Sequence, residues 1–197
     1  MPKTTANHQQ SWNSLKPDSL YAVEQLRDQL AAPAESLQDI VDAYLIAKRS
    51  LAESMQALLR ESLPEKCATF HDLREQLANA LFARYGGRVP GRYLKVPYGT
   101  RVHEELFTIL LEHQGRPVPA MMLRIISADS VHTERRMREL RELGLNINAG
   151  KAQGVDVYTL ESLEIDISLL SAIPKNLINQ DKSLQTPEKG ALISYLN

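Results

Sequence analysis

Apolar residues recur at helical spacing through the first 85 residues, in segments that proline and glycine separate. The pattern predicts a first helix over 19–32, capped by Asp18 and ended by Pro33. Another helix is predicted from Thr69 until the glycine pair at 86–87 stops it, with Leu73, Leu77, Leu81 and Phe82 on one apolar face. With a longer helix between these two, residues 1–86 are predicted to be a region of three helices.

The middle segment, 37–63, predicts the longest helix, with an apolar stripe along it. Its large apolar residues recur every seven positions, as Leu37, Tyr44, Leu51 and Leu58. A stripe with this spacing needs a partner helix, either in the same chain or in a second subunit. Lys48 and Ser54 interrupt the stripe, which favours packing within the chain and leaves a homodimer as the alternative.

The second half of the chain begins with a segment rich in glycine and proline, which predicts a basic connector over 87–99. Three shorter helices are then expected, with the turn ADS between the second and third, followed by two alternating stretches that predict a β-hairpin. This is the order of a winged helix-turn-helix domain, predicted over 100–162. Residues 163–197 form a C-terminal extension, and the expected fold is mainly α.

The composition is that of a globular protein whose charges nearly cancel. Apolar residues make up 43% and charged residues 24%, and the 23 Lys and Arg against 24 Asp and Glu give a net charge of −1. Binding to nucleic acid therefore requires local segregation of charge. One cysteine excludes an intramolecular disulfide. The sequence shows neither a signal peptide nor an apolar span, so we expect a cytoplasmic protein without a membrane partner.

Positive charge gathers in the third helix of the predicted winged domain. At 100° per residue, Met137 and Leu140 point towards the core, and Arg135, Arg138 and Glu139 point outwards. On a face that enters the major groove, the planar fork of arginine suits a guanine edge or a phosphate. The DNA-binding residues predicted on this helix are His132, Thr133, Arg135, Arg136 and Arg138. Opposite charges four residues apart are also typical of a solvated helix, where each pair stabilises by roughly 0.2–0.5 kcal/mol.

Two further segments favour DNA binding over a solvated surface. Between Leu77 and His103 there is no acidic residue, whereas five cations alternate with three tyrosines. The hairpin tip is basic as well. Phosphate contacts are predicted for Arg88, Arg92, Lys95, Arg101, Lys151 and Gln153. Residues 156–166 carry four acids and no base, so we expect that end to face away from DNA.

The sequence lacks the motifs of several enzyme classes. It has neither the His-Glu-x-x-His spacing of a zinc site nor a phosphate-binding loop with its lysine. The five histidines, at 8, 71, 103, 113 and 132, do not form the cluster that an HNH nuclease requires, and Cys67 lacks a convincing base. We therefore expect no catalytic residue, no metal and no cofactor.

Residues 104–160 resemble the winged-helix module of bacterial restriction endonucleases, including HNH-type enzymes, and of related defence proteins. The stretches that carry the resemblance are GRPVPAMML, RRMRELRELGLNI and GVDVYTL. The resemblance implies a module that reads DNA or docks a partner, and it transfers no catalytic residue. It implies restriction or anti-phage defence as the setting, with the protein as an accessory or regulatory component.

The sequence therefore favours a non-catalytic protein that binds double-stranded DNA. The alternative is an interaction subunit whose winged helix and long helix dock a partner enzyme of a defence complex. An unrecognised enzyme is the least supported reading. Salt-dependent binding to duplex DNA distinguishes the first two functions.

Overall fold

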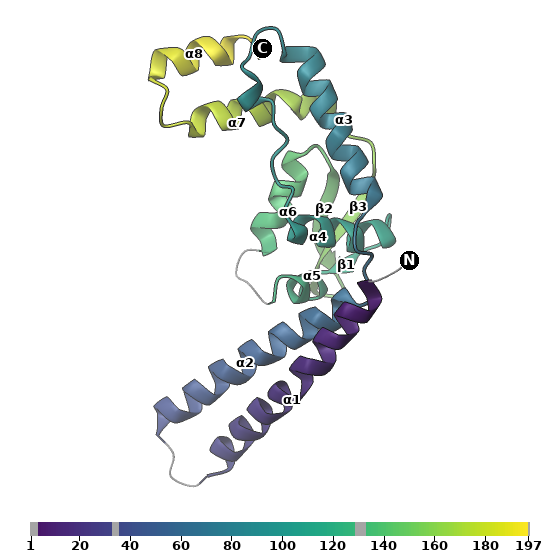
Figure 1. Cartoon of the computed structure of the whole chain (residues 1–197), viewed down its shortest axis with the longest axis vertical. Helices are drawn as coiled ribbons and strands as arrows, with labels where there is room; N and C mark the ends of the chain where they lie inside the picture. The colour runs from purple at the N-terminus through teal and green to yellow at the C-terminus, as the bar shows by residue number, and fades with distance from the viewer. Residues whose placement is uncertain (1–3, 33–35, 129–132, 197) are drawn as a thin grey trace. The chain divides into compact units, whose positions relative to one another are not determined.

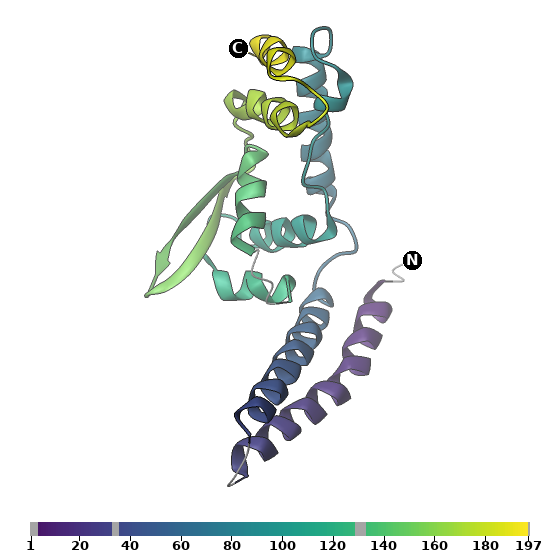
Figure 2. The same ribbon diagram turned by 90° about the vertical axis from the view of Figure 1, so that its left-hand side faces the viewer.

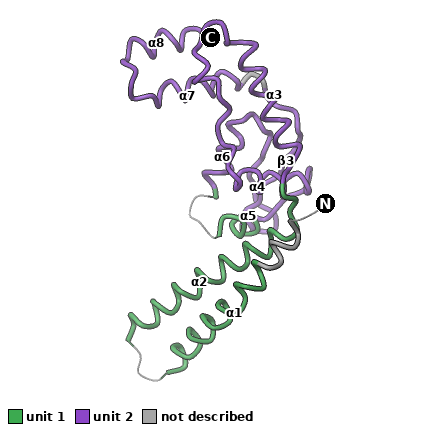
Figure 3. The backbone as a smooth tube through the Cα atoms, viewed as in Figure 1, with its two compact units in different colours: residues 1–65, 121–133 green, residues 66–120, 134–197 purple. Residues whose placement is uncertain are grey.

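The computed structural model describes residues 4–32, 36–128 and 133–196, and it is mainly helical with one small sheet (Figure 1). The mainly α fold predicted from the sequence is confirmed. The chain forms two compact units (Figure 3): unit 1 is 1–65 with 121–133, and unit 2 is 66–120 with 134–197. This division differs from the domains expected over 1–86, 87–99, 100–162 and 163–197, which stay a prediction.

Unit 1 is built on an antiparallel hairpin of α1 (Thr4–Ala31) and α2 (Leu37–Arg60). Small side chains line the contact between these helices, and the buried ones are Ser19, Ala22, Ala47, Ser54 and Ala57. The Ser19 hydroxyl donates to the Ser54 hydroxyl at 2.9 Å. Because the fully buried positions are held by small residues, many large apolar residues of the hairpin stay exposed on its other faces.

Helix α1 begins at Thr4 and runs through Pro17, so the predicted start after an Asp18 cap is wrong. Proline removes one backbone hydrogen bond from a helix interior. Trp12 and Leu15, both half-buried, extend the apolar stripe to the residues before Pro17, and this packing accounts for the longer helix.

The third helix of unit 1 is α5 (Ala120–Ile126), which joins the unit from Met121 onwards. Its Leu123 and Ile126 side chains are fully buried. The Gln56 side chain of α2 donates to the Ile126 carbonyl at 2.5 Å, which attaches the end of α5 to α2.

Unit 2 contains the remaining elements. Its helices are α3 (Ala68–Tyr85), η1 (Gly91–Tyr93), α4 (Arg101–Glu112), α6 (Thr133–Glu142), η2 (Ile167–Ser171), α7 (Ala172–Gln180) and α8 (Thr186–Ser194). Helices α3 and α4 share a core in which the rings of Phe70 and Phe107 lie 5.3 Å apart. Leu73, Leu77 and Leu81 of α3 are buried as predicted, but Phe82 is 66% exposed, so its predicted place on the apolar face is wrong.

The sheet of unit 2 has the order β1-β3-β2, with both pairs antiparallel. The strands are β1 (Val118–Pro119), β2 (Asn146–Ala152) and β3 (Val155–Ser162). The predicted hairpin is present, and its tip projects away from the helices of the unit (Figure 2). Gln153 and Gly154 form its two-residue turn with φ of 51° and 81°, the backbone that such turns require.

Strand β1 was missed, because residues 118–119 were expected to lead into the second helix. Two residues are too few to show a strand period. Pro119 is tolerated here because β1 lies at the edge of the sheet, where a missing N–H leaves the ladder intact.

The C-terminal residues pack on unit 2. Leu196 is buried, and the Tyr85 hydroxyl donates to its carbonyl at 3.5 Å. Among the described helices, none combines the length and the apolar character that a membrane crossing requires.

We predict that Gly144→Ala destabilises unit 2, because Gly144 ends α6 with a φ of +87°. A β-carbon there would also lie 2.9 Å from Ile165 Cγ2 and 3.2 Å from the Asp166 carbonyl oxygen. The left-handed backbone alone costs about 1–2 kcal/mol for alanine. Gly150→Ala is the matched control, since its added carbon would have no neighbour within 4 Å. Urea unfolding that gives the two variants equal stability would contradict the prediction.

Candidate nucleic-acid interface

Helix α6 presents two different faces, as its sequence predicts. Met137 and Leu140 are fully buried, whereas Arg135 and Arg138 are exposed and Arg136 is half-buried. Thr133, predicted to help bind DNA, lies on the buried side of α6, since it is 1% exposed and its hydroxyl lies 2.6 Å from that of Ser127. His132 lies outside the described residues.

Glu139 was expected on the outer face of α6, and this expectation is also wrong, because its side chain is buried. Its carboxylate accepts hydrogen bonds from Arg135 Nε at 2.9 Å and from Arg136 Nη1 at 2.7 Å. A third contact, at 2.8 Å, joins it to Nε2 of His103 on α4. The carboxylate therefore links the core of unit 2 to two arginines at its surface.

His103 is itself buried, and its two ring nitrogens have different partners. Nδ1 lies 2.6 Å from the Thr100 hydroxyl, and Nε2 faces the Glu139 carboxylate. Because an ionised carboxylate can only accept, the neutral ring carries its proton on Nε2. Burial lowers the pKa of His103, and this outweighs the opposite effect of Glu139. The structure thus favours a neutral His103.

Glu139 is the charged member of this pair. Burial alone would raise the pKa of Glu139, but the hydrogen bonds from His103, Arg136 and Arg135 outweigh it and lower the pKa. A buried carboxylate is stable in its charged form only when such donors surround it.

Tyr98 fixes the other end of α6. Its hydroxyl donates to Glu142 Oε2 at 2.6 Å, and its ring lies 5.7 Å from that of His103. Burial and then the Glu142 contact raise the pKa of Tyr98 to about 12. Tyr98 therefore joins the end of the connector to the last turn of α6.

The arrangement leaves guanidinium donors available on the outer face of α6. Arg135 is 61% exposed in its side chain and contacts Glu139 through Nε, so its two terminal nitrogens remain for another acceptor. Arg138 is exposed and forms no ion pair with any residue that the structure describes. This pair of exposed arginines is well suited to bind phosphate or a base edge.

The hairpin tip is less basic than predicted. Lys151 lies directly across the hairpin from Asp156, with Nζ 3.9 Å from Oδ1, and both side chains are exposed. Asp156, one of the acids expected to face away from DNA, therefore lies beside Lys151 at the proposed DNA-binding tip. Gln153 is exposed in the turn.

The cations of the connector mostly have partners close by. Arg92 lies 3.8 Å from Asp181, which follows α7, and its guanidinium carbon lies 4.8 Å from the centre of the Tyr93 ring. The Ser183 and Tyr93 contacts hold the pKa of Asp181 well below its usual range. Arg92 therefore belongs to the contact with the C-terminal helices and is not brought to α6.

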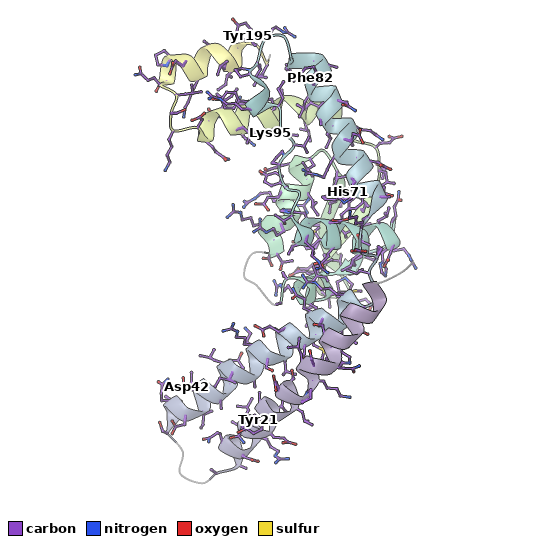
Figure 4. All side chains as sticks on the ribbon, in the orientation of Figure 1. Tyr21, Asp42, His71, Phe82, Lys95 and Tyr195 are labelled. Atoms are coloured by element: carbon purple, nitrogen blue, oxygen red, sulfur yellow. The ribbon has the colours of Figure 1, made fainter. Side chains whose placement is uncertain are left out.

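Three other predicted cations lie at separate points of unit 2. Arg88 donates to the Arg84 carbonyl at 2.9 Å, and Arg101 pairs with Glu105 at 2.8 Å. Lys95 is exposed and forms no ion pair among the described residues (Figure 4). Tyrosines 85 and 93 are buried, so they serve packing and leave no stacking surface for bases.

Sequence reasoning missed the contacts that His103, Thr100 and Tyr98 make around α6. The spacing of Glu139 from Arg135 and Arg136 is visible in the sequence, but a contact with a histidine 36 residues earlier is not. Within the described ranges, no three His, Cys, Asp or Glu side chains gather as a group that could hold a metal ion.

A family model described as the KpnI N-terminal domain matches residues 103–166. The matched segment runs from α4 to just beyond β3 and contains both His103 and Glu139. The match relates this part of the chain to restriction systems. Comparison of the chain with curated proteins and with solved structures gave no match.

We predict that stability falls as the pH is lowered below 7, because unfolded His103 titrates near 6.5 and the folded form has a lower pKa. The unfolded chain then binds more protons, so the slope can reach about 1.4 kcal/mol per pH unit. The lowered pKa of Glu139 acts in the same direction at lower pH. His103→Gln can still donate to Glu139 and does not titrate. Urea unfolding between pH 7 and 5 should show a shallower slope for this variant, and equal slopes would contradict the assignment.

Proposed function

We propose that the protein binds double-stranded DNA without catalysing a reaction, as an accessory or regulatory component of a restriction or anti-phage defence system. The match of residues 103–166 to the KpnI N-terminal domain supports the setting. The element order α4, β1, α5, α6, β2, β3 and the sheet order β1-β3-β2 support a winged helix-turn-helix over this segment.

The observation that carries the proposal is the way Glu139 holds two arginines on α6. A flexible arginine loses side-chain entropy when it binds, at a cost of about 0.5–1.5 kcal/mol for each immobilised side chain. Arg135 and Arg136 are already restrained by the buried carboxylate, so part of this cost is met on folding. Arg138 adds an exposed guanidinium on the same helix.

The proposed roles follow from exposure. Arg135 and Arg138 contact base edges or phosphates in the major groove, with Arg136 beside them. Lys151 and Gln153 at the hairpin tip contact the backbone, as do Lys95, Arg88 and Arg101 where the duplex reaches them. We assign no DNA contact to Arg92, which pairs with Asp181, or to the buried Thr133.

The second candidate is an interaction subunit that docks a partner enzyme. It is favoured by the hairpin tip, where Asp156 offsets the charge of Lys151, and by the near-zero net charge. A partner protein tolerates a surface of mixed sign better than phosphates do. The two functions differ in whether the pure protein binds duplex DNA.

We predict that Arg138→Ala weakens binding to duplex DNA by about 10-fold, within the 1–3 kcal/mol expected for a base contact. Arg49→Ala is the matched control, because Arg49 is an exposed helical arginine of unit 1 paired with Glu53. Fluorescence anisotropy with a labelled random duplex, repeated across a salt series, measures both variants. Equal affinities of the two variants would contradict a DNA contact by Arg138.

Lys151→Ala should weaken binding to all sequences alike and reduce the salt slope by about 1, as loss of one phosphate contact requires. The same anisotropy series gives this slope. Wild-type protein that shows no binding even at low salt would favour the docking function instead.

A further inference from the structure

Helix α2 carries a row of large apolar side chains that the described part of unit 1 covers only in part. Leu37, Val41, Tyr44, Leu51 and Leu58 are between 39% and 78% exposed. The α2 residues buried at the contact with α1 are small, among them Ala47 and Ser54, and they lie on a neighbouring face. The heptad spacing of the large residues therefore describes a second contact, separate from the one with α1.

The row continues onto two other helices of unit 1. On α1, helical geometry places Val23 and Leu30 on the same side of the hairpin, and they are 39% and 65% exposed. On α5, Met121 and Ile125 are 69% and 37% exposed. A groove of about 610 Å³ lies among these three helices and is lined by residues of all of them. We call this surface the apolar face.

We propose that the apolar face binds the same face of a second copy of the chain, so that α1 and α2 of both copies form a four-helix bundle. The two-fold axis runs parallel to the helices and places α1 of one copy beside α2 of the other. This dimer does not depend on DNA binding, because its interface lies in unit 1.

The area of the face supports a second copy as its occupant. With roughly 180 Å² for a fully exposed large apolar residue, its side chains present about 800 Å², the area that a standard interface buries on each partner. Monomeric proteins rarely expose apolar patches above a few hundred Å². A helical hairpin also provides a self-complementary shape, since two such hairpins complete a bundle.

Charge at the edge of the face is consistent with this symmetry. The hydroxyl of Ser19 contacts Ser50 and Ser54, and these contacts define which residues of α1 lie opposite which residues of α2. A two-fold axis parallel to the helices leaves each residue at the same height along the bundle in both copies. Glu24 of one copy therefore lies at the height of Lys48 of the other. The symmetry repeats this opposite-charge pair on both sides of the bundle. All neighbouring helices are antiparallel, which is favourable for their dipoles.

Sedimentation equilibrium of the full chain tests the proposal. Wild-type protein should have twice the 22.1 kDa mass of one chain at micromolar concentration. Tyr44→Glu with Leu51→Glu places charges in the apolar face and should weaken the dimer by about 100-fold or more. Tyr21→Glu with Ile46→Glu is the matched control, since both residues are more than half exposed, lie on the opposite sides of α1 and α2 from the apolar face and should leave the dimer intact.

Circular dichroism verifies that each variant stays helical, and a charge exchange keeps the test decisive if the face variant unfolds. Lys48→Glu should weaken the dimer, and adding Glu24→Lys should restore it. Wild-type protein that is a helical monomer would overturn the proposal. So would equal dissociation of the face and control variants, or a charge exchange that restores nothing.

Discussion

The buried carboxylate of Glu139 determines how unit 2 presents α6. A buried charge costs several kcal/mol of solvation free energy unless donors surround it. Here one imidazole N–H and two guanidinium groups supply those donors. Because His103 comes from α4, the contact fixes α6 against the core. Because Arg135 and Arg136 come from the outer side of α6, the same contact fixes the surface. The packing of α6 and the proposed recognition of DNA therefore both depend on the Glu139 carboxylate.

Elsewhere in unit 2 the positive charges are balanced locally. Lys151 faces Asp156 across the hairpin, and Arg92 faces Asp181 beside α7. These exposed pairs contribute little to stability, typically below 1 kcal/mol. By contrast, α6 retains exposed guanidinium donors beside its buried carboxylate, although the net charge of the chain is close to zero. Unit 1 differs in kind, since its prominent surface is apolar and suited to another helical hairpin.

Much of the fold follows from the hydrophobic pattern. The helical spacing predicted α2, α3 and α4, the alternation predicted the hairpin, and the helical wheel placed Met137 and Leu140 inside. The helical wheel wrongly placed Glu139 on the outer face of α6. A carboxylate is expected to face solvent unless a distant partner is known, and the partner here, His103, lies on another helix. Pro17 was taken as a boundary because proline has a low propensity for the helix interior. This local preference does not include the packing of α1 on α2, which keeps the helix continuous. The sequence therefore predicted the helix that carries the candidate site, α6, but not the hydrogen bonds that join Glu139 to His103 and the two arginines.

The most direct measurement is nuclear magnetic resonance of the arginine Nε–H groups during titration with duplex DNA. We expect a slowly exchanging Nε–H for Arg135 in the free protein, since this group donates to a buried carboxylate. That resonance should shift as DNA is added, whereas Arg49, which is paired on exposed α2, should not respond. An Arg135 resonance that stays unchanged at saturating DNA would contradict the account.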